Sequence, residues 1–138
     1  MHVAPFCGMV LADFGATVIR IDRMVGMNPD NLARGKKSIS VDLKEKKSLE
    51  IIFKLIEKAD VLIEPFRPGV AEKLGFGPKE ALQKNPKLIY ARLTGFGQTG
   101  YYANLAGHDI NYLSISGALS AFGRKGENPI FPLNILTD

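Results

Sequence analysis

The chain has 138 residues, 46% of them hydrophobic, which is enough for one core of ordinary domain size, and nothing in it indicates a second. Its 18 Lys and Arg against 14 Asp and Glu give a formal net charge of +4, too small and too dispersed for a dedicated nucleic-acid-binding protein. A single cysteine, Cys7, excludes an intramolecular disulfide and favours a reducing compartment, and no apolar run reaches the ~20 residues that span a bilayer. We therefore expect one soluble globular unit with no membrane segment and no nucleic-acid partner.

The first third of the chain predicts a helix, a strand, a loop and a second strand. Residues 5–15 carry apolar side chains at helical spacing and end on Gly15, as helices often do. A strand is predicted at 17–21, a loop at 24–37 because Gly, Asn, Pro and basic residues occur there without a period, and a further strand at 38–41. The basic runs 34–37 and 44–47 suit an anionic small molecule, although a solvated charged face is the more ordinary explanation.

The middle of the chain contains its most regular helix. Asp42 and Glu45 have the spacing of a capping box, and one helix face follows them. The apolar residues of that face are Leu49, Ile52, Phe53, Ile56 and Ala59. A short strand at 61–63, a proline-bounded turn that exposes Arg67, two short helices at 71–74 and 79–83, and a strand at 88–93 complete the pattern. Strands that alternate with helices predict an α/β fold with a mostly parallel sheet.

A glycine motif follows the last of these strands. Gly95-Phe96-Gly97-Gln98-Thr99-Gly100 matches the G-x-G-x-x-G spacing of dinucleotide-binding turns. In that fold the third glycine lies in a helix that begins at the motif, whereas residues 99–104 have no apolar period, and no acidic residue ends a second strand about 20 residues further on. The context therefore argues against nicotinamide or flavin binding. A turn whose backbone approaches a ligand closely stays open.

His108 is one of only two histidines and stands where another helix should begin. Apolar residues from Asp109 onward recur at helical spacing, namely Ile110, Leu113, Ile115, Ala118 and Leu119. Backbone N–H groups at a helix start can stabilise an oxyanion, such as the enolate of a thioester, and an adjacent imidazole can accept a proton from the neighbouring carbon. The sequence thus predicts carbon-acid chemistry, with a surface or hydrogen-bonded structural histidine as the ordinary alternative.

Asp138 could supply a second base. It follows residues 129–136, which have the composition of a strand or extended run that could bring the carboxylate back beside His108. Two bases on opposite faces of one carbon can invert its configuration, because one removes the proton and the conjugate acid of the other returns it. Sequence spacing leaves that geometry open.

Together these motifs resemble the family III CoA-transferase superfamily, and within it the members that invert the α-carbon of 2-methylacyl-CoA thioesters. The resemblance is strongest in Ala106-Gly107-His108-Asp109-Ile110-Asn111-Tyr112 and in residues 88–100 before it, and it covers nearly the whole chain. Further matching segments are residues 5–7, 12–16, 20–23, 34–38, 64–67 and 132–134. The fold that the resemblance implies is a Rossmann-like parallel sheet with flanking helices, incomplete in this chain.

The resemblance also implies a site. His108 and Asp138 would be the two catalytic bases, and the backbone N–H of Asp109 would hold the thioester oxygen. The implied CoA contacts are Arg23, Val41, Leu43, Arg67, Lys73 and Gly107, with Tyr112 lining the site. The three cations among them have a physical reason, since the CoA phosphates need positive charge. No metal and no redox cofactor is expected, because coenzyme A is part of the substrate.

The same resemblance predicts the setting of the chain. Residues 1–138 would be the N-terminal part of the large CoA-binding α/β domain, with the small domain, a supporting acid and the C-terminal return lying outside it. We expect an interlocked homodimer for the full-length protein, a role in fatty-acid or bile-acid metabolism, and a location in peroxisomes and mitochondria in animals or in the cytoplasm of bacteria. Without the cover that excludes water, we expect residues 1–138 alone to be inactive or nearly so.

Three alternatives stay open. A family III CoA-transferase would use Asp138 as a nucleophile, although the Gly-His-Asp-Ile-Asn-Tyr context of His108 favours inversion of the α-carbon. A non-catalytic module would bind CoA thioesters through the basic residues without chemistry. An unstable remnant would expose apolar surface where a missing domain should pack. The preferred acyl group is open between a branched fatty acid, a bile-acid intermediate and an arylpropionyl thioester.

Overall fold

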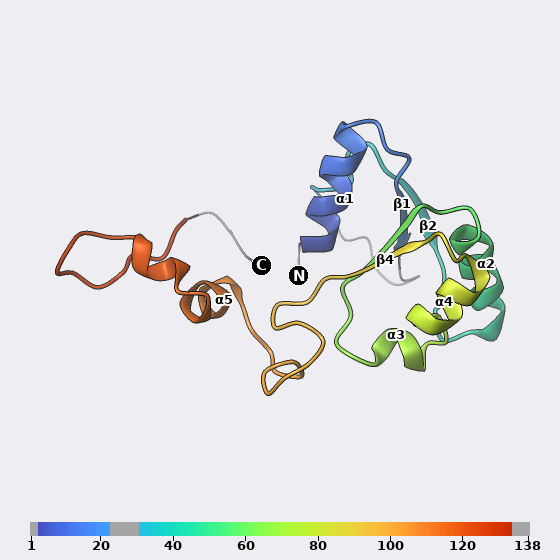
Figure 1. Ribbon diagram of the computed structural model, residues 1–138. Helices are drawn as coiled ribbons and strands as arrows, with labels where there is room; N and C mark the ends of the chain where they lie inside the picture. Colours follow the sequence, from blue (N-terminus) through green and yellow to red (C-terminus); the bar gives the residue numbers. More distant parts are fainter. Residues whose placement is uncertain (1–2, 23–30, 134–138) are drawn as a thin grey trace.

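The computed structural model describes residues 3–22 and 31–133 (Figure 1). Its elements in chain order are α1 (Val3–Asp13), β1 (Ile19–Asp22), β2 (Lys37–Ser40), α2 (Lys46–Ile56), β3 (Val61–Glu64), α3 (Val70–Lys73), α4 (Pro78–Lys84), β4 (Ile89–Arg92), α5 (Asp109–Ile115) and the 3-10 helix η1 (Ala118–Ala121). Helices and strands alternate as the sequence predicts. No helix in the described part of the chain is long and apolar enough to cross a membrane.

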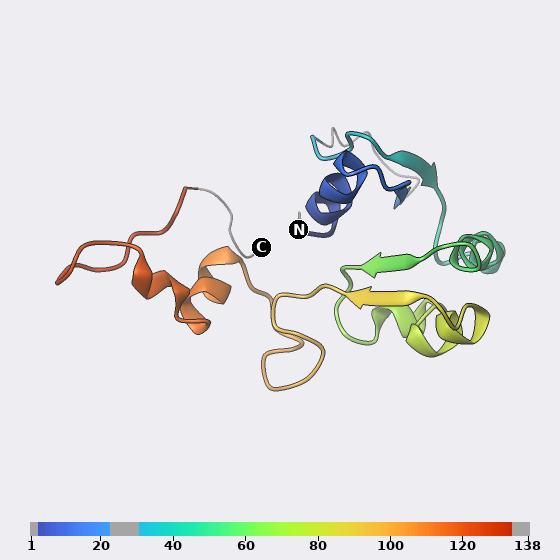
Figure 2. The same ribbon diagram turned by 45° about the horizontal axis from the view of Figure 1, so that its top comes forward.

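The strands form parallel pairs, which confirms the predicted α/β class. β1 pairs with β2, and β3 pairs with β4 so that Glu64 lies opposite Arg92. Among the described residues these are two separate two-stranded sheets with no hydrogen-bonded edge between them (Figure 2). Helices α3 and α4 form the crossover between β3 and β4, as a parallel pair requires.

The hydrophobic core lies between the β3–β4 pair and helices α2, α3 and α4. The predicted apolar face of α2 is confirmed, because Ile52 and Ile56 are each only 2% exposed. The buried cluster consists of Val41, Ile52, Ile56, Ala71, Phe76, Ala81 and Leu88. Asn85 donates from Nδ2 to the carbonyl oxygens of Ile56 (2.9 Å) and Ala59 (2.8 Å), so it ties the end of α4 to the turn that follows α2.

The start of α2 differs from the capping-box prediction. Asp42 accepts a hydrogen bond from the backbone N–H of Lys44 (3.0 Å), and the N–H of Glu45 donates to the carbonyl of Asp42 (3.0 Å). These bonds close a local turn, because a short Asp side chain competes with the helix for nearby backbone donors. The helix therefore begins only at Lys46.

Gly117 ends a helix earlier than predicted, whereas Gly15 ends one where the sequence predicts. The single helix predicted from Asp109 to Leu119 is broken at Gly117, whose φ of 79° ends α5, and the chain continues as η1. Gly15, with a φ of 94°, ends α1 as predicted. Residues 129–133 form no strand, so the predicted alternative of an extended run stays open there, and residues 134–136 lie outside the described residues.

Apart from α1, β1 and β2, the described chain has two regions of different character. We call residues 41–94, which contain the core, the packed unit, and residues 95–133, which contain α5 and η1, the α5 segment. Figures 1 and 2 both show the α5 segment extending away from the sheets and the other helices. Within the α5 segment, α5 packs against η1. The candidate site residues are therefore divided between two regions.

Candidate active site

His108 directly precedes α5, as the sequence predicts. Its backbone is extended, with φ −132° and ψ 171°, and its side chain is exposed. Asn111 Oδ1 accepts the N–H of His108 (2.9 Å), and the N–H of Asn111 donates to the carbonyl of His108 (2.8 Å). These two bonds hold the backbone of His108 against the first turn of the helix. Asp109, the first residue of α5, is only 5% exposed.

Tyr112 and Gly107, both predicted to belong to the site, lie together. An ideal Cβ on Gly107 would lie 2.7 Å from Tyr112 Cε1 and 2.7 Å from Phe96 Cε2. The rings of Phe96 and Tyr112 meet edge to face, with centroids 4.8 Å apart. The turn after β4 is therefore filled by aromatic side chains of this chain. Residues 99–104 form turns and no helix, which confirms that the glycine motif does not open a dinucleotide-binding helix.

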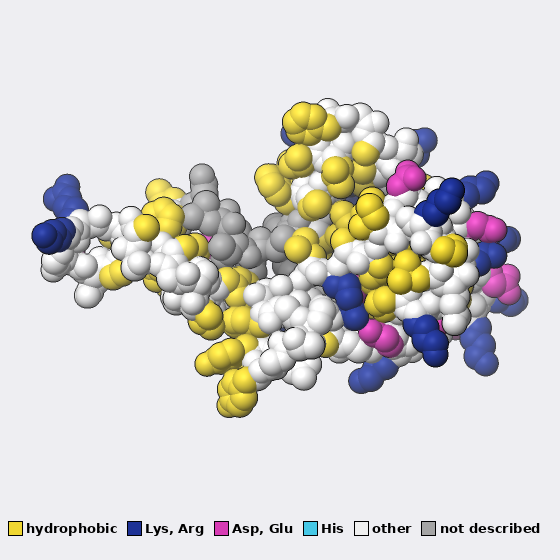
Figure 3. Space-filling model, in the orientation of Figure 1, with side chains coloured by type: hydrophobic (Ala, Val, Ile, Leu, Met, Phe, Trp, Pro, Cys, Tyr) yellow, Lys and Arg dark blue, Asp and Glu magenta, His cyan; other side chains and the backbone are white. Residues whose placement is uncertain are grey.

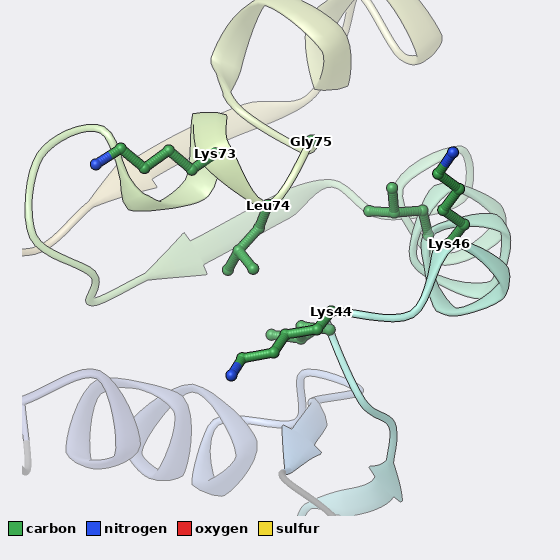
Figure 4. A pocket seen from close by; sticks show the side chains of 7 residues that line it. Lys44, Lys46, Lys73, Leu74 and Gly75 are labelled. Carbon is green, nitrogen blue, oxygen red and sulfur yellow. The ribbon is translucent and has the colours of Figure 1, made fainter.

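A pocket lies between the start of α2 and the end of α3 (Figure 4). Its volume is about 380 Å³, and its lining residues are Leu43, Lys44, Lys46, Leu49, Lys73, Leu74 and Gly75. The structure thus brings together two of the predicted CoA contacts, Leu43 and Lys73. In Figure 4 the ammonium ends of Lys44 and Lys73 extend to the same side of the pocket, and Lys46 rises from the α2 side. The site prediction omitted Lys44 and Lys46, although their basic run suited an anionic ligand.

The other predicted CoA contacts lie elsewhere. Val41 is buried, and its side chain packs in the hydrophobic core. Its backbone N–H donates to the carbonyl of Asp22 (3.0 Å). Arg67 is exposed in the turn after β3 and does not line the pocket. Arg23 and the predicted second base, Asp138, lie outside the described residues. Their roles stay predictions.

A cluster of charged residues at the ends of β3 and β4 was not predicted. Glu64 is only 2% exposed, and it accepts hydrogen bonds from Arg92 Nε (2.8 Å) and from the N–H of Phe66 (2.8 Å). Arg92 also donates from Nη1 and Nη2 to the two carboxylate oxygens of Glu72 (2.8 and 3.1 Å). This bond to Arg92 holds the pKa of Glu72 below its ordinary value. Arg92 thereby links both strands to α3, the helix that carries Lys73.

Tyr90 lies on β4, two residues before Arg92 of this cluster. Its hydroxyl donates to the carbonyl of Phe76 (3.0 Å). Burial, and secondarily the negative charge of Glu64, raises the pKa of Tyr90 to about 12. The phenol is therefore a neutral hydrogen-bond donor at physiological pH. Within residues 3–22 and 31–133 there is no group of three or more His, Cys, Asp or Glu side chains that could hold a metal ion.

Comparisons with known proteins place this arrangement in a family. The sequence model of the family described as "CoA-transferase family III" matches residues 1–138, so the chain belongs to that family. The chain is similar to proteins named alpha-methylacyl-CoA racemase, at 58% identity over 134 residues for mouse and 57% over 136 residues for human. These matches cover 97% of this chain and 35% of each racemase, so the chain spans about a third of the length of those relatives.

Solved structures agree with the fold. A Mycobacterium tuberculosis protein, 34% identical, superposes with a TM-score of 0.81 over 96% of this chain and 41% of its own. A CAIB/BAIF family protein from Brucella suis superposes with a TM-score of 0.82 at 31% identity, over 95% of this chain and 40% of its own. The predicted resemblance and the predicted fold class are therefore confirmed.

Proposed function

We propose that this chain contributes the CoA-binding surface and one catalytic base to an enzyme that inverts the α-carbon of 2-methylacyl-CoA thioesters. The observation that supports this most directly is His108 at the start of α5, in a chain 58% identical over 97% of its length to a protein named alpha-methylacyl-CoA racemase. The imidazole of His108 is exposed at the helix start, and a base that takes a proton from a bound thioester needs this access.

The proposed chemistry is a transfer of one proton across a carbon. His108 accepts the α-proton from one face, and the C–H electron pair delocalises as an enolate whose oxygen accepts the backbone N–H of Asp109. Protonated Asp138 then donates its proton to the opposite face, which leaves His108 protonated and Asp138 ionised. Proton exchange with solvent restores both groups, and reversing the two roles converts the other stereoisomer. Because the thioester itself acidifies the α-carbon, the reaction needs no metal and no redox cofactor.

The proposed binding site for coenzyme A is the pocket between α2 and α3. Its volume of about 380 Å³ suits part of a nucleotide-containing ligand, since small-molecule pockets span roughly 300–1,000 Å³. Leucine side chains line its wall, where they can contact a flat base, and Lys44, Lys46 and Lys73 can bind phosphate oxygens. Arg23 and Arg67 would supply further positive charge along the pyrophosphate.

A covalent CoA transfer is the second candidate, because other relatives carry transferase names. The probable fatty acyl-CoA transferase of Mycobacterium tuberculosis is 34% identical over 152 residues, and a succinyl-CoA–L-malate CoA-transferase subunit of Chloroflexus aurantiacus is 32% identical over 145 residues. In that reaction the Asp138 carboxylate would attack the thioester carbonyl, form an acyl anhydride and release CoA as a thiolate. His108 would then have no required role.

We place the active state in a homodimer whose further domain covers His108. The exposure of the His108 side chain supports this part of the proposal, because water beside an enolate competes for its protonation. Residues 1–138 alone should therefore exchange α-hydrogen far more slowly than the complete native protein that carries them.

The test is hydrogen exchange in deuterated buffer. The complete native protein, given one stereoisomer of a 2-methylacyl-CoA, should incorporate deuterium at the α-carbon while the other stereoisomer appears. His108→Ala should lower the exchange rate about 10²–10⁴-fold, the usual contribution of one acid–base residue. His2→Ala is the matched control, because His2 is the other histidine in the chain and has no proposed role.

The same assay separates the alternatives. A transferase would move CoA to an acceptor carboxylate, would keep that activity in His108→Ala and would lose it in Asp138→Asn. A non-catalytic binding module would bind CoA, seen by calorimetry, with no α-deuterium in any variant. Unchanged α-exchange in His108→Ala would overturn the proposed function.

A further inference from the structure

The glycine motif that follows β4 has no role in the proposed chemistry. The motif that begins at Gly95 leads into turns and not into a helix, so it does not place a nucleotide on a helix start. Gly95 and Gly107 are also absent from the glycines with positive φ in the described chain, so neither is needed for its backbone conformation. Another physical reason must explain why these positions lack a side chain.

The ring of Tyr112 supplies that reason at Gly95. An ideal Cβ on Gly95 would overlap Cζ, Cε1 and Oη of Tyr112. Non-bonded carbon atoms need about 3.5–4.0 Å, so no residue with a Cβ fits here while the ring keeps its place. Gly95 therefore provides a flat stretch of backbone against which the phenol ring lies.

Gly107 and Phe96 also lie against the Tyr112 ring. A Cβ on Gly107 would lie 2.7 Å from Tyr112 Cε1, and Phe96 meets the Tyr112 ring at an interplanar angle of 74°. Two glycines 12 positions apart in sequence thus both leave room for the Tyr112 ring, and Gly107 leaves room for Phe96 as well. A side chain added at either glycine would displace the ring, because packed side chains transmit small displacements to their neighbours.

Tyr112 connects this enclosure to the candidate base. Its backbone N–H donates to the carbonyl of His108 (3.3 Å), and Gly107 immediately precedes His108 in the chain. Helix α5 otherwise packs against η1, and Figure 1 shows it far from the helices of the packed unit. The contact between Tyr112 and Gly95 therefore joins the first turn of α5 to the residues that follow β4.

From this geometry we infer that Tyr112 is a positioning residue: its ring, seated on Gly95 and Gly107, sets the placement of the His108–Asp109 turn relative to the end of β4. The kinetic consequence of this inference rests on the proposed function, whereas its structural consequence does not. Gly95, the first glycine of the motif, thus leaves room for an aromatic side chain of the chain itself, and its effect on the reaction comes through the orientation of His108.

The test compares Gly95→Ala with Gly8→Ala in the complete native protein. Gly8 is the matched control, because it lies in α1 with no positive φ and its ideal Cβ would come no closer than 3.4 Å to any atom outside its own helix backbone and chain neighbours. Gly95→Ala should lower kcat about 100-fold, the cost of displacing a catalytic group by roughly 1 Å, with little change in KM. Gly8→Ala should leave both constants unchanged.

A double variant isolates the contact. Tyr112→Ala should lose about as much kcat as Gly95→Ala, and Gly95→Ala/Tyr112→Ala should lose no more than Tyr112→Ala, because the added methyl then meets no ring. Tyr112→Phe keeps the ring and should retain a kcat well above that of Tyr112→Ala. The inference fails if the two single losses multiply in the double variant, if Gly95→Ala behaves like Gly8→Ala, or if Tyr112→Phe is as damaged as Tyr112→Ala.

Amide hydrogen exchange without substrate distinguishes this inference from the proposed function. Gly95→Ala should accelerate exchange at residues 108–112 and leave residues 46–56 of α2 as they are in the parent protein. If the parent protein shows no α-proton exchange, the proposed function fails. The amide measurement then still tests the contact of the Tyr112 ring with Gly95. Equal amide protection at 108–112 in both proteins would overturn the inference.

Discussion

The packed unit and the α5 segment bury their apolar residues to very different extents. The packed unit encloses its own core, with Ile52 and Ile56 fully buried. In the α5 segment the buried residues among those described are Ala103, Asp109 and Leu113. Its exposed large apolar side chains are Tyr101, Tyr102, Leu105, Ile110, Ile115, Ile130, Phe131 and Leu133. Figure 3 shows apolar side chains at the surface of the α5 segment, with Lys and Arg side chains at its far left end, and a mixture of charged and apolar side chains over the packed unit.

This difference separates binding from catalysis in the proposed enzyme. The pocket proposed to bind CoA lies in the packed unit, where neighbouring helices and strands hold its walls. His108 lies in a region with few buried apolar residues. Its placement therefore depends on a few contacts, such as that of the Tyr112 ring with Gly95. Regions with few buried apolar contacts open locally at low free-energy cost. We therefore predict that mutations in the packed unit change the global free energy of unfolding, whereas mutations in the α5 segment change amide exchange locally.

Removing the cation from the charged cluster should give the largest effect. Arg92→Gln leaves the buried Glu64 carboxylate without its charged partner, which should lower the free energy of unfolding by about 3–5 kcal/mol. Lys84→Gln breaks the exposed pair with Glu57 (3.5 Å) and should cost under ~1 kcal/mol. Urea unfolding measures both. Equal costs would show that the cluster does not stabilise the packed unit.

Deleting a buried apolar side chain in each region tests the comparison directly. Ile52→Ala should lower the global free energy of unfolding by about 2–5 kcal/mol, whereas Ile51→Ala, at a residue 44% exposed, should stay within ~0.5 kcal/mol. Leu113→Ala, at a residue 1% exposed in α5, should accelerate amide exchange in α5 and η1 and leave the urea midpoint near that of the parent protein. A midpoint shift as large as that of Ile52→Ala would show that both regions unfold as one cooperative unit.

Alkaline pH should reveal a smaller effect confined to the packed unit. Tyr90→Phe removes the donor to the Phe76 carbonyl, which should cost about 1 kcal/mol at neutral pH. The pKa of Tyr90 is raised from 10.0 to about 12, so the unfolded chain ionises first. The stability that Tyr90 contributes is therefore complete below pH 10 and is lost as the pH rises toward 12.

The measurement for Tyr90 is urea unfolding of the parent and Tyr90→Phe proteins from pH 8 to pH 12. The difference between them should narrow above pH 10, the ordinary pKa of a tyrosine, as the pH approaches the folded pKa. Tyr101→Phe is the control, because the Tyr101 side chain is exposed to solvent and lies outside the core of the packed unit. If the two proteins differ by the same free energy of unfolding from pH 8 to pH 12, ionisation of Tyr90 does not control its contribution to stability.

Local patterns predicted much of the fold. The spacing of Leu49, Ile52 and Ile56 identified the buried face of α2, and the alternation of strands and helices identified the parallel pairs, because both signals arise from residues near one another in the chain. Helix ends were less accurate. Asp42 has capping-box spacing and yet closes a turn, and Gly117 ends α5 early, because a cap or break depends on backbone conformation that neighbouring residues only bias.

By itself the sequence determined the family, the class of fold and the position of His108 before a helix, since each depends on a contiguous motif or period. The tertiary structure alone decided which distant residues meet. Arg92 reaches Glu64 across 28 positions and Glu72 across 20, Lys44 and Lys73 share one pocket, and Tyr112 occupies the space above Gly95. No local signal marks these pairs, because the packing of whole helices and strands brings them together. Gly95, which opens a motif that resembles a nucleotide-binding turn in sequence, lies against an aromatic ring of the same chain in the folded structure.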